Sequence, residues 1–262
     1  MPASAMPNIL LLGGTTEARE LAPLLAARGI RATLSYAGRT LAPRVLPLPT
    51  RIGGFGGVAG LVAWLRAEGI THVVDATHPF AARMSANAVA ATQETGVPLL
   101  AFTRPAWQAG PGDRWQHVAD LDGAVAALAG PARRVLLALG RQHVSLFAAQ
   151  PQHHYVLRFV DPPEAPPPLP RHALVVDRGP FTLDGDLALL RDHAVDLVVC
   201  KNAGGSAAQA KLIAARALRL PVIMIDRPFI PPRQEVHDAQ AVLDWIAHAP
   251  APTPLAGTLR GV

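Results

Sequence analysis

Two glycines and two threonines follow the first apolar run of the chain. Residues 9–12 predict a buried strand, Gly13, Gly14, Thr15 and Thr16 follow, and a helical pattern then begins. At such a turn the first N–H groups of the helix point outward, glycines admit a phosphate, and the helix dipole favours its charge. Either threonine can cap the helix or donate to a phosphate oxygen. An ordinary capped turn explains the same residues, because neither G-x-G-x-x-G nor a P-loop is present.

The second predicted strand carries a serine and an arginine where a NAD-binding sheet carries an acid. In such sheets an acidic residue about 20 residues past the glycines holds the ribose hydroxyls. Here Ser35 lies in the strand 32–36 and Arg39 follows it. A guanidinium forks readily onto a phosphate, so the pair favours NADP(H) over NAD(H). The alternative is that Arg39 is a solvated loop arginine.

Two further predicted strand ends hold binding candidates. Four glycines surround Phe55 at 53–57, where they permit close backbone approach or a mobile loop. The strand 71–75 ends in Asp75, followed by Thr77 and His78. We interpret His78 as a tentative proton donor or substrate contact, although a lone histidine is more often structural. The predicted cofactor site comprises Gly13, Gly14, Thr15, Thr16, Ser35, Arg39, Gly54, Phe55, Gly56, Asp75 and Thr77.

The second half of the chain repeats this arrangement. Of 24 basic residues only two are lysines, Lys201 and Lys211, and they lie ten positions apart. Lys201 follows a predicted strand, and a lysine ammonium suits phosphate or carboxylate; Lys211 is equally well explained as solvated. Arg141 follows another strand. The predicted substrate-binding set comprises His78, Arg141, Lys201, Asn202, Gly204, Gly205 and Lys211.

Apolar runs alternate with helical patterns along most of the chain. This alternation predicts an α/β protein with two Rossmann-like domains, whose parallel sheets are flanked by helices. We expect an N-terminal cofactor-binding domain at 1–120, a C-terminal domain at 121–250 and a disordered tail at 251–262. Ligands of such sheets bind beyond the carboxyl ends of the strands.

Composition excludes several classes of function. Half of the 262 residues are apolar, and the net charge is +5 without basic clusters, so we expect no nucleic-acid partner. No apolar run reaches the roughly 20 residues of a membrane span, and no signal peptide is recognisable. A cytoplasmic protein is the simplest interpretation. The single Cys200 reads as a core residue, and the histidines lack metal-ligand spacing, so we expect no metal site.

These strand ends together resemble the precorrin-6A reductase family of cobalamin biosynthesis. The matching runs are LGGTTEAR at 12–19, GGFGG at 53–57, DATHPFA at 75–81, KNAGG at 201–205 and PVIMIDRP at 221–228. The run at 75–81 is the most specific of them. The glycine turn alone would be a weak signal.

The resemblance implies two α/β domains with a cleft between them, NADPH as reductant and a macrocyclic tetrapyrrole as substrate. The family's reaction saturates one ring double bond and gives precorrin-6B. Because a precorrin carries many carboxylates, arginines lining a cleft would orient it. The candidates are Arg83, Arg104, Arg141 and Arg227.

Two other classes of function fit the same pattern. A transferase with a nucleotide-linked donor would use the glycine turn for a diphosphate but would not need Arg39. A non-catalytic two-lobed binding protein is the second alternative. A preference for NADPH over NADH separates the reductase from both.

Overall fold

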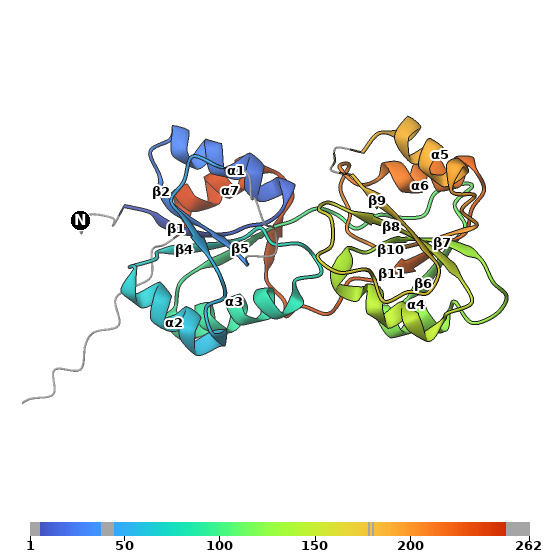
Figure 1. The fold of residues 1–262 in the computed structure, drawn as a ribbon. Coiled ribbons are helices and arrows are strands. Elements are labelled where there is room, and N and C mark those ends of the chain that lie inside the picture. The colour runs from blue at the N-terminus through green and yellow to red at the C-terminus, as the bar shows by residue number, and fades with distance from the viewer. Residues whose placement is uncertain (1–5, 38–44, 178, 180, 250–262) are drawn as a thin grey trace, which may run out of the picture. The chain divides into compact units, whose positions relative to one another are not determined.

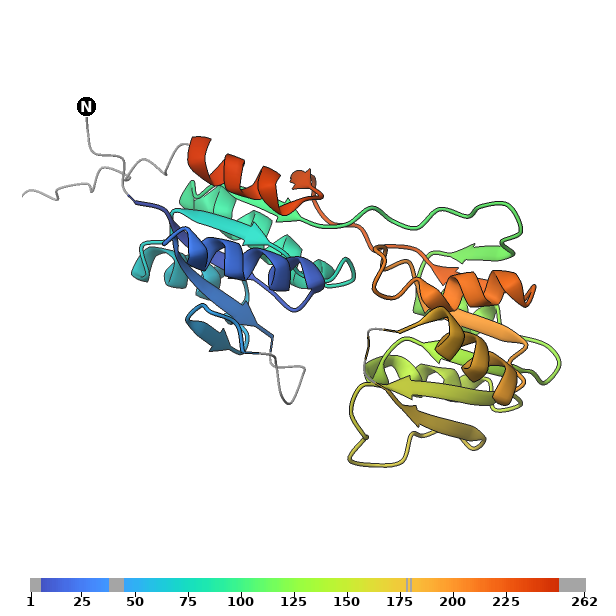
Figure 2. The same ribbon diagram turned by 90° about the horizontal axis from the view of Figure 1, so that it is seen from above.

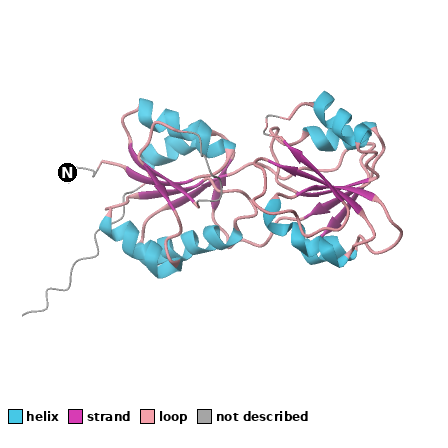
Figure 3. Ribbon diagram, viewed as in Figure 1, coloured by secondary structure: helices cyan, strands magenta, loops and turns pink. Residues whose placement is uncertain are grey.

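The computed structural model describes residues 6–37, 45–177, 179 and 181–249. The chain forms two compact units. Unit 1 comprises residues 1–104 and 229–262, and unit 2 comprises residues 105–228. Each unit has a sheet covered by helices on both faces (Figures 1 and 3). The predicted α/β class with two parallel sheets is confirmed. Within the described residues, no helix is both long and apolar enough to span a bilayer.

Unit 1 is built on six parallel strands in the order β12-β5-β4-β1-β2-β3. The strands are β1 (Asn8–Leu12), β2 (Arg31–Tyr36), β3 (Thr50–Ile52), β4 (His72–Asp75), β5 (Leu99–Phe102) and β12 (Gln234–Val236). The helices are α1 (Thr16–Ala27), α2 (Gly57–Ala67), α3 (Ala82–Thr95) and α7 (Ala239–His248). All strands being parallel, their carboxyl ends lie at one edge, and the strand order reverses between β1 and β4.

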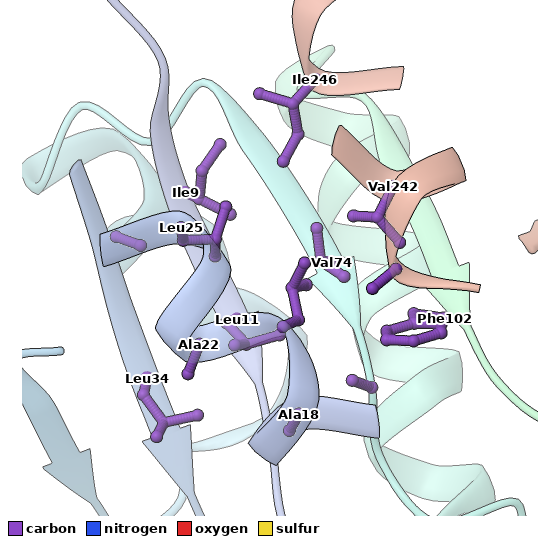
Figure 4. Close-up of a cluster of buried hydrophobic side chains, with 14 of the residues drawn as sticks. Ile9, Leu11, Ala18, Ala22, Leu25, Leu34, Val74, Phe102, Val242 and Ile246 are labelled. Carbon is purple, nitrogen blue, oxygen red and sulfur yellow. The ribbon is translucent and has the colours of Figure 1, made fainter. Parts of the chain in front are cut away.

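Both faces of this sheet are buried, which is why its strands read as continuous apolar runs. Successive side chains of a strand point to opposite faces. Leu11 therefore packs beneath α1 and α7, while Leu10 packs against α2 and α3. Figure 4 shows Val242 and Ile246 of α7 in the first of these cores, near Val74 and Phe102 of the sheet.

Unit 2 has the same architecture, with six parallel strands in the order β6-β11-β10-β7-β8-β9. The strands are β6 (Trp115–Val118), β7 (Arg134–Ala138), β8 (His154–Phe159), β9 (His172–Val176), β10 (Leu197–Lys201) and β11 (Val222–Ile225). The helices are α4 (Leu121–Ala126), the 3₁₀ helix η1 (Arg141–Ala149), α5 (Leu183–Asp192) and α6 (Ala210–Ala217). Cys200 is fully buried beneath α5 and α6, which confirms its prediction as a core residue.

The observed division differs from the expected domains at 1–120 and 121–250. β6 lies before residue 121 but pairs with β11 of unit 2, and β12 and α7 lie in the second half but belong to unit 1. The physical reason is that each sheet takes its edge strand from chain that has just crossed between units. Local periodicity cannot indicate such a partner. The expected tail at 251–262 lies outside the described residues.

The chain passes from unit 1 to unit 2 at residues 104–107, and side chains anchor this first crossing within each unit. Figure 2 shows the chain running between the units. In unit 1, Arg104 donates to Glu17 at 2.7 Å, with both side chains largely buried. In unit 2, the Trp107 N–H donates to Asn202 Oδ1 at 2.8 Å, and Asn202 Nδ2 donates to the Trp107 carbonyl at 3.0 Å. The Trp107 indole N–H also donates to the Gly205 carbonyl at 2.8 Å.

The second crossing, at residues 227–233, is anchored in the same way. In unit 2, Arg227 donates from Nε to the Asn202 carbonyl at 3.1 Å and from Nη2 to the Ala203 carbonyl at 3.2 Å. In unit 1, the guanidinium of Arg233, which is 8% exposed, lies 3.3 Å from Oδ2 of Asp75. Arg233 also lies 3.5 Å from Glu235, so two carboxylates compensate its buried charge.

Replacing Asn202 by Ala should destabilise unit 2 by about 2–4 kcal/mol, because two backbone groups of Trp107 lose their buried partner. Urea denaturation followed by tryptophan fluorescence and far-UV circular dichroism measures this loss. The exposed Gln142→Ala serves as the control and should change the unfolding free energy by less than about 0.5 kcal/mol. Equal stabilities of Asn202→Ala and the control would contradict the anchoring role.

Replacing Glu17 by Gln should cost about 1–3 kcal/mol of stability at neutral pH, because Arg104 loses its charged partner. Burial raises the pKa of Glu17, but its own backbone N–H and Arg104 outweigh this and hold the pKa below the usual 4.5. A lowered pKa gives stability that is complete above the unfolded-state pKa and is lost as pH falls through the folded-state value.

The stability difference between the wild type and Glu17→Gln should therefore vanish in acid. Glu94→Gln is the matched control, since Glu94 pairs with Arg66 at 3.5 Å with both side chains more than half exposed. That change should cost less than about 1 kcal/mol. Unfolding curves measured between neutral and acidic pH check both expectations; a Glu17→Gln penalty that persists in acid would show that the ion pair is not its source.

Candidate functional site

The two glycines after β1 are required for different reasons. A Cβ on Gly13 would lie 2.6 Å from Cδ1 of Leu34, so a side chain there would force the buried Leu34 to shift. Gly14 has φ +117°, a backbone conformation that glycine alone adopts readily, and a Cβ there would have nothing within 4 Å among the described atoms. Gly14 is therefore the position where a ligand can approach the backbone.

The two threonines divide the work of the turn. Thr15 is buried; its hydroxyl accepts from the Ala18 N–H at 3.4 Å as the cap of α1 and donates to the Ala76 carbonyl at 2.7 Å. That hydroxyl ties the β1–α1 turn to the segment after β4, across the point where the strand order reverses. Thr16 is exposed on the first turn of α1, with Arg19 beside its hydroxyl at 3.3 Å. Of the two predicted hydroxyls, Thr16 is the one placed to meet a ligand.

Arg51, which the sequence analysis did not single out, organises the corner at the ends of β2 and β3. It pairs in register with Ser35, whose hydroxyl accepts from Nη1 at 2.9 Å. Nη1 also donates to the Gly53 carbonyl at 3.0 Å, and Nη2 to the Gly54 carbonyl at 3.1 Å. The parallel register of Ser35 and Arg51 is the signal that would have found it. The predicted Arg39 lies outside the described residues.

The glycine-rich loop after β3 turns tightly into α2. Gly56 has φ +81° as the residue before the helix, and a Cβ on Gly60 would lie 1.7 Å from the Phe55 carbonyl oxygen. The Phe55 ring packs edge-on against Trp64 with centroids 5.4 Å apart, and the Arg51 guanidinium lies 3.7 Å above it. Phe55 therefore anchors the loop by its ring, and the contact of the loop backbone with a cofactor stays a prediction.

The acid at the end of β4 is used within the protein. Asp75 is 2% exposed, and its Oδ1 accepts from the Thr77 N–H at 3.1 Å and the Thr77 hydroxyl at 2.7 Å. Its Oδ2 faces Arg233. The geometry gives Asp75 and Thr77 a bracing role, and their predicted contacts with a cofactor stay predictions.

His78 follows this brace and is partly exposed. Its Nδ1 accepts from the Phe80 N–H at 3.2 Å, and the two rings lie 5.8 Å apart. Because Nδ1 is an acceptor, the neutral imidazole carries its proton on Nε2. The fold therefore holds His78 in one tautomer, with Nε2–H as the donor.

The lysine loop of unit 2 holds the chain where the sequence predicted substrate contacts. Asn202 is buried against Trp107, and a Cβ on Gly204 would lie 2.1 Å from the Pro105 carbonyl oxygen. Gly205 accepts from the Trp107 indole. These contacts give this part of the loop a structural role, and its predicted substrate contacts stay predictions. Lys201 is partly exposed at the end of β10, and its substrate contact stays a prediction.

Lys211 is buried and does not reach a surface. Its ammonium donates to the Ala208 carbonyl and lies 4.8 Å from the Trp107 ring. Burial lowers the pKa of Lys211. Neither the predicted substrate contact nor a solvated side chain fits this position, because the ammonium packs inside unit 2 behind the loop.

The four arginines proposed for the macrocycle fall into two groups. Arg104 and Arg227 are committed to the crossing segments. Arg83 on α3 and Arg141 at the start of η1 are exposed. Arg141 lines a cavity of about 260 Å³ in unit 2 together with Phe159 and the proline-rich loop 163–168. Arg83 and Arg141 are thus the two with exposed side chains, and a macrocycle contact stays a prediction for all four arginines.

Comparison with known proteins identifies the relatives of this chain. The precorrin-6A reductase of Rhodobacter capsulatus is 61% identical in sequence to this chain, over 92% of this chain and 96% of its own length. A precorrin-6A reductase from Sinorhizobium sp. is 49% identical over 95% of this chain and 96% of its own length. A solved structure of CobK precorrin-6A reductase, 60% identical, superposes with a TM-score of 0.89 over 94% of this chain and 99% of that one.

A family model agrees with these relatives. The model described as precorrin-6x reductase CbiJ/CobK matches residues 8–247, which include both units and both crossings. Reductases of this kind imply a nicotinamide cofactor. The chain therefore belongs to the precorrin-6x reductase family CbiJ/CobK, and it is an oxidoreductase.

Proposed function

We propose that the chain uses NADPH to reduce one ring double bond of precorrin-6A, giving precorrin-6B in cobalamin biosynthesis. The observation that carries the proposal is the match to precorrin-6A reductases over nearly the whole chain, at up to 61% identity among the relatives described above. The match includes every strand end that holds a candidate residue. The proposal takes a metal-free macrocycle as the substrate, since the two relatives described above are named precorrin-6A reductases.

The carboxyl edge of unit 1 fits the diphosphate of such a cofactor. Gly14 leaves open space beside the first turn of α1, and Thr16 is exposed on that turn. Helix N-termini favour anions because of their N–H groups and dipole. The bound nicotinamide supplies the hydride. The role of the protein is to hold the dinucleotide where the strand order reverses, because ligands of such sheets bind there.

The remaining requirement is a proton for the reduced double bond. A hydride adds to one atom of the bond and a proton to the other, so NADPH leaves as NADP⁺ and the macrocycle gains two hydrogens. The proposed donor is His78 in its imidazolium form, which delivers a proton from Nε2 and regains one from solvent. The Phe80 N–H contact belongs to the neutral form, in which Nδ1 accepts. Arg83 and Arg141 bind acetate or propionate groups of the macrocycle, since both are exposed.

The function is tested with purified protein, NADPH and precorrin-6A. We expect loss of NADPH absorbance with formation of a macrocycle heavier by two hydrogens. A parallel reaction with cobalt-precorrin-6A should be slower. Loss of NADPH without the product, or no binding of either NADPH or NADH by the wild type, would rule the proposed function out.

Replacing His78 by Asn should slow turnover by about 10²- to 10⁴-fold, the usual contribution of a proton donor. Asn keeps an acceptor near the Phe80 N–H and removes the ionisable imidazole, so the NADPH dissociation constant should stay within about threefold of wild type. Steady-state kinetics and NADPH titration measure the two quantities. His248→Ala, at an exposed position in the last turn of α7, is the control. An unchanged rate in His78→Asn would leave water as the proton source.

A further inference from the structure

The corner at the ends of β2 and β3 holds a cation that is fixed before any ligand binds. Three acceptors orient the Arg51 guanidinium: the Ser35 hydroxyl and the carbonyls of Gly53 and Gly54. All three are neutral. Among the described residues no carboxylate lies within ion-pair distance of Arg51, whereas Arg104 and Arg233 each face an acid. Arg51 therefore brings an uncompensated positive charge to this corner.

One face of this guanidinium rests on an aromatic platform. Its Cζ lies 3.7 Å from the centroid of Phe55, and Trp64 supports that ring from the side. The platform and the three acceptors limit the rotamers of Arg51, so little entropy remains to be lost when an anion binds. Partial burial lowers the pKa of Arg51. An anion at this corner would offset that unfavourable desolvation of the charge.

The position of Arg51 matches a particular group of a dinucleotide. In unit 1 the strand order places β2 next to β1, so the end of β2 lies one strand away from the turn at Gly14. In NAD-binding sheets the end of β2 meets the ribose of the adenosine half, through an acid that accepts from its hydroxyls. Here Ser35 and Arg51 occupy that end, and both can donate to a phosphate.

We propose that Arg51, with Ser35, binds the 2′-phosphate of NADPH and determines the preference of this enzyme for NADPH over NADH. The guanidinium forks onto phosphate oxygens. The Ser35 hydroxyl accepts from Arg51 and keeps its own proton for a phosphate oxygen. The inference rests on the proposed function, and it goes further by naming the specificity-determining residue.

The test measures the dissociation constants of NADPH and NADH for the full-length protein by calorimetric titration, without substrate. Arg51→Met keeps an unbranched side chain over Phe55 and removes the charge. We expect the NADPH constant to rise about 10- to 100-fold and the NADH constant to change by less than about threefold. Adenosine 2′-monophosphate should lose affinity in parallel with NADPH, while adenosine 5′-monophosphate should not.

Two further variants make the outcomes distinct. Arg31→Ala, at an exposed position on β2, is the matched control and should leave both constants unchanged. Arg39→Ala tests the arginine indicated by the sequence. Equal weakening of NADPH and NADH in Arg51→Met, or an NADPH preference that survives there and is lost in Arg39→Ala, would overturn the inference. A wild type that binds neither nucleotide would instead overturn the proposed function.

Discussion

Each sheet takes an edge strand from chain that has just crossed between the units, and this constraint governs where the buried polar groups lie. β6 pairs with β11 after the first crossing, and β12 pairs with β5 after the second. For either strand to pair in register, the crossing segment that precedes it must be held in a fixed position. Arg104, Arg233 and Asn202 provide that fixation, at the cost of desolvating charged and polar groups that only their partners make tolerable.

The same constraint explains why residues after the strands have two kinds of role. Asp75 in unit 1 and Asn202 in unit 2 hold crossing segments, whereas Gly14 and His78 of unit 1 have less protein cover. The first kind positions the second. Thr15 is the clearest case, because one buried hydroxyl caps α1 and fixes the turn to the segment that leads to His78. A site fixed in this way is organised before its ligands arrive, which is how positioning contributes to catalysis.

Sequence reasoning found what local pattern encodes. The buried runs of β1, β4 and β10, the capped turn at Gly13 to Thr16 and the α/β class follow from periodicity and turn chemistry. The short edge strands β6 and β12 are only partly buried and carry no such signal. Trp107 and Asn202 are 95 residues apart in the chain, so the sequence does not reveal their contact. The sequence analysis therefore predicted only ligand contacts for the lysine loop, and missed that the loop hydrogen-bonds to the crossing segment. The sequence analysis missed Arg51 for a similar reason, since its hydrogen-bond partner Ser35 comes from a neighbouring strand.

At the carboxyl edge of the unit 1 sheet, ion pairs reduce the repulsion that acidic side chains would exert on an anion. Glu17 lies in the first turn of α1, where an unpaired carboxylate would compete with a diphosphate for the positive end of the helix. Its pairing with Arg104 cancels that charge, so a bond that fixes a crossing segment also keeps the helix terminus receptive. Arg233 does the same for Asp75. Both acids thus have a cationic partner, although Arg233 is shared with Glu235 at 3.5 Å, whereas the guanidinium of Arg51 has neutral acceptors only. On the proposal above, that charge is what attracts a phosphorylated ligand to this edge.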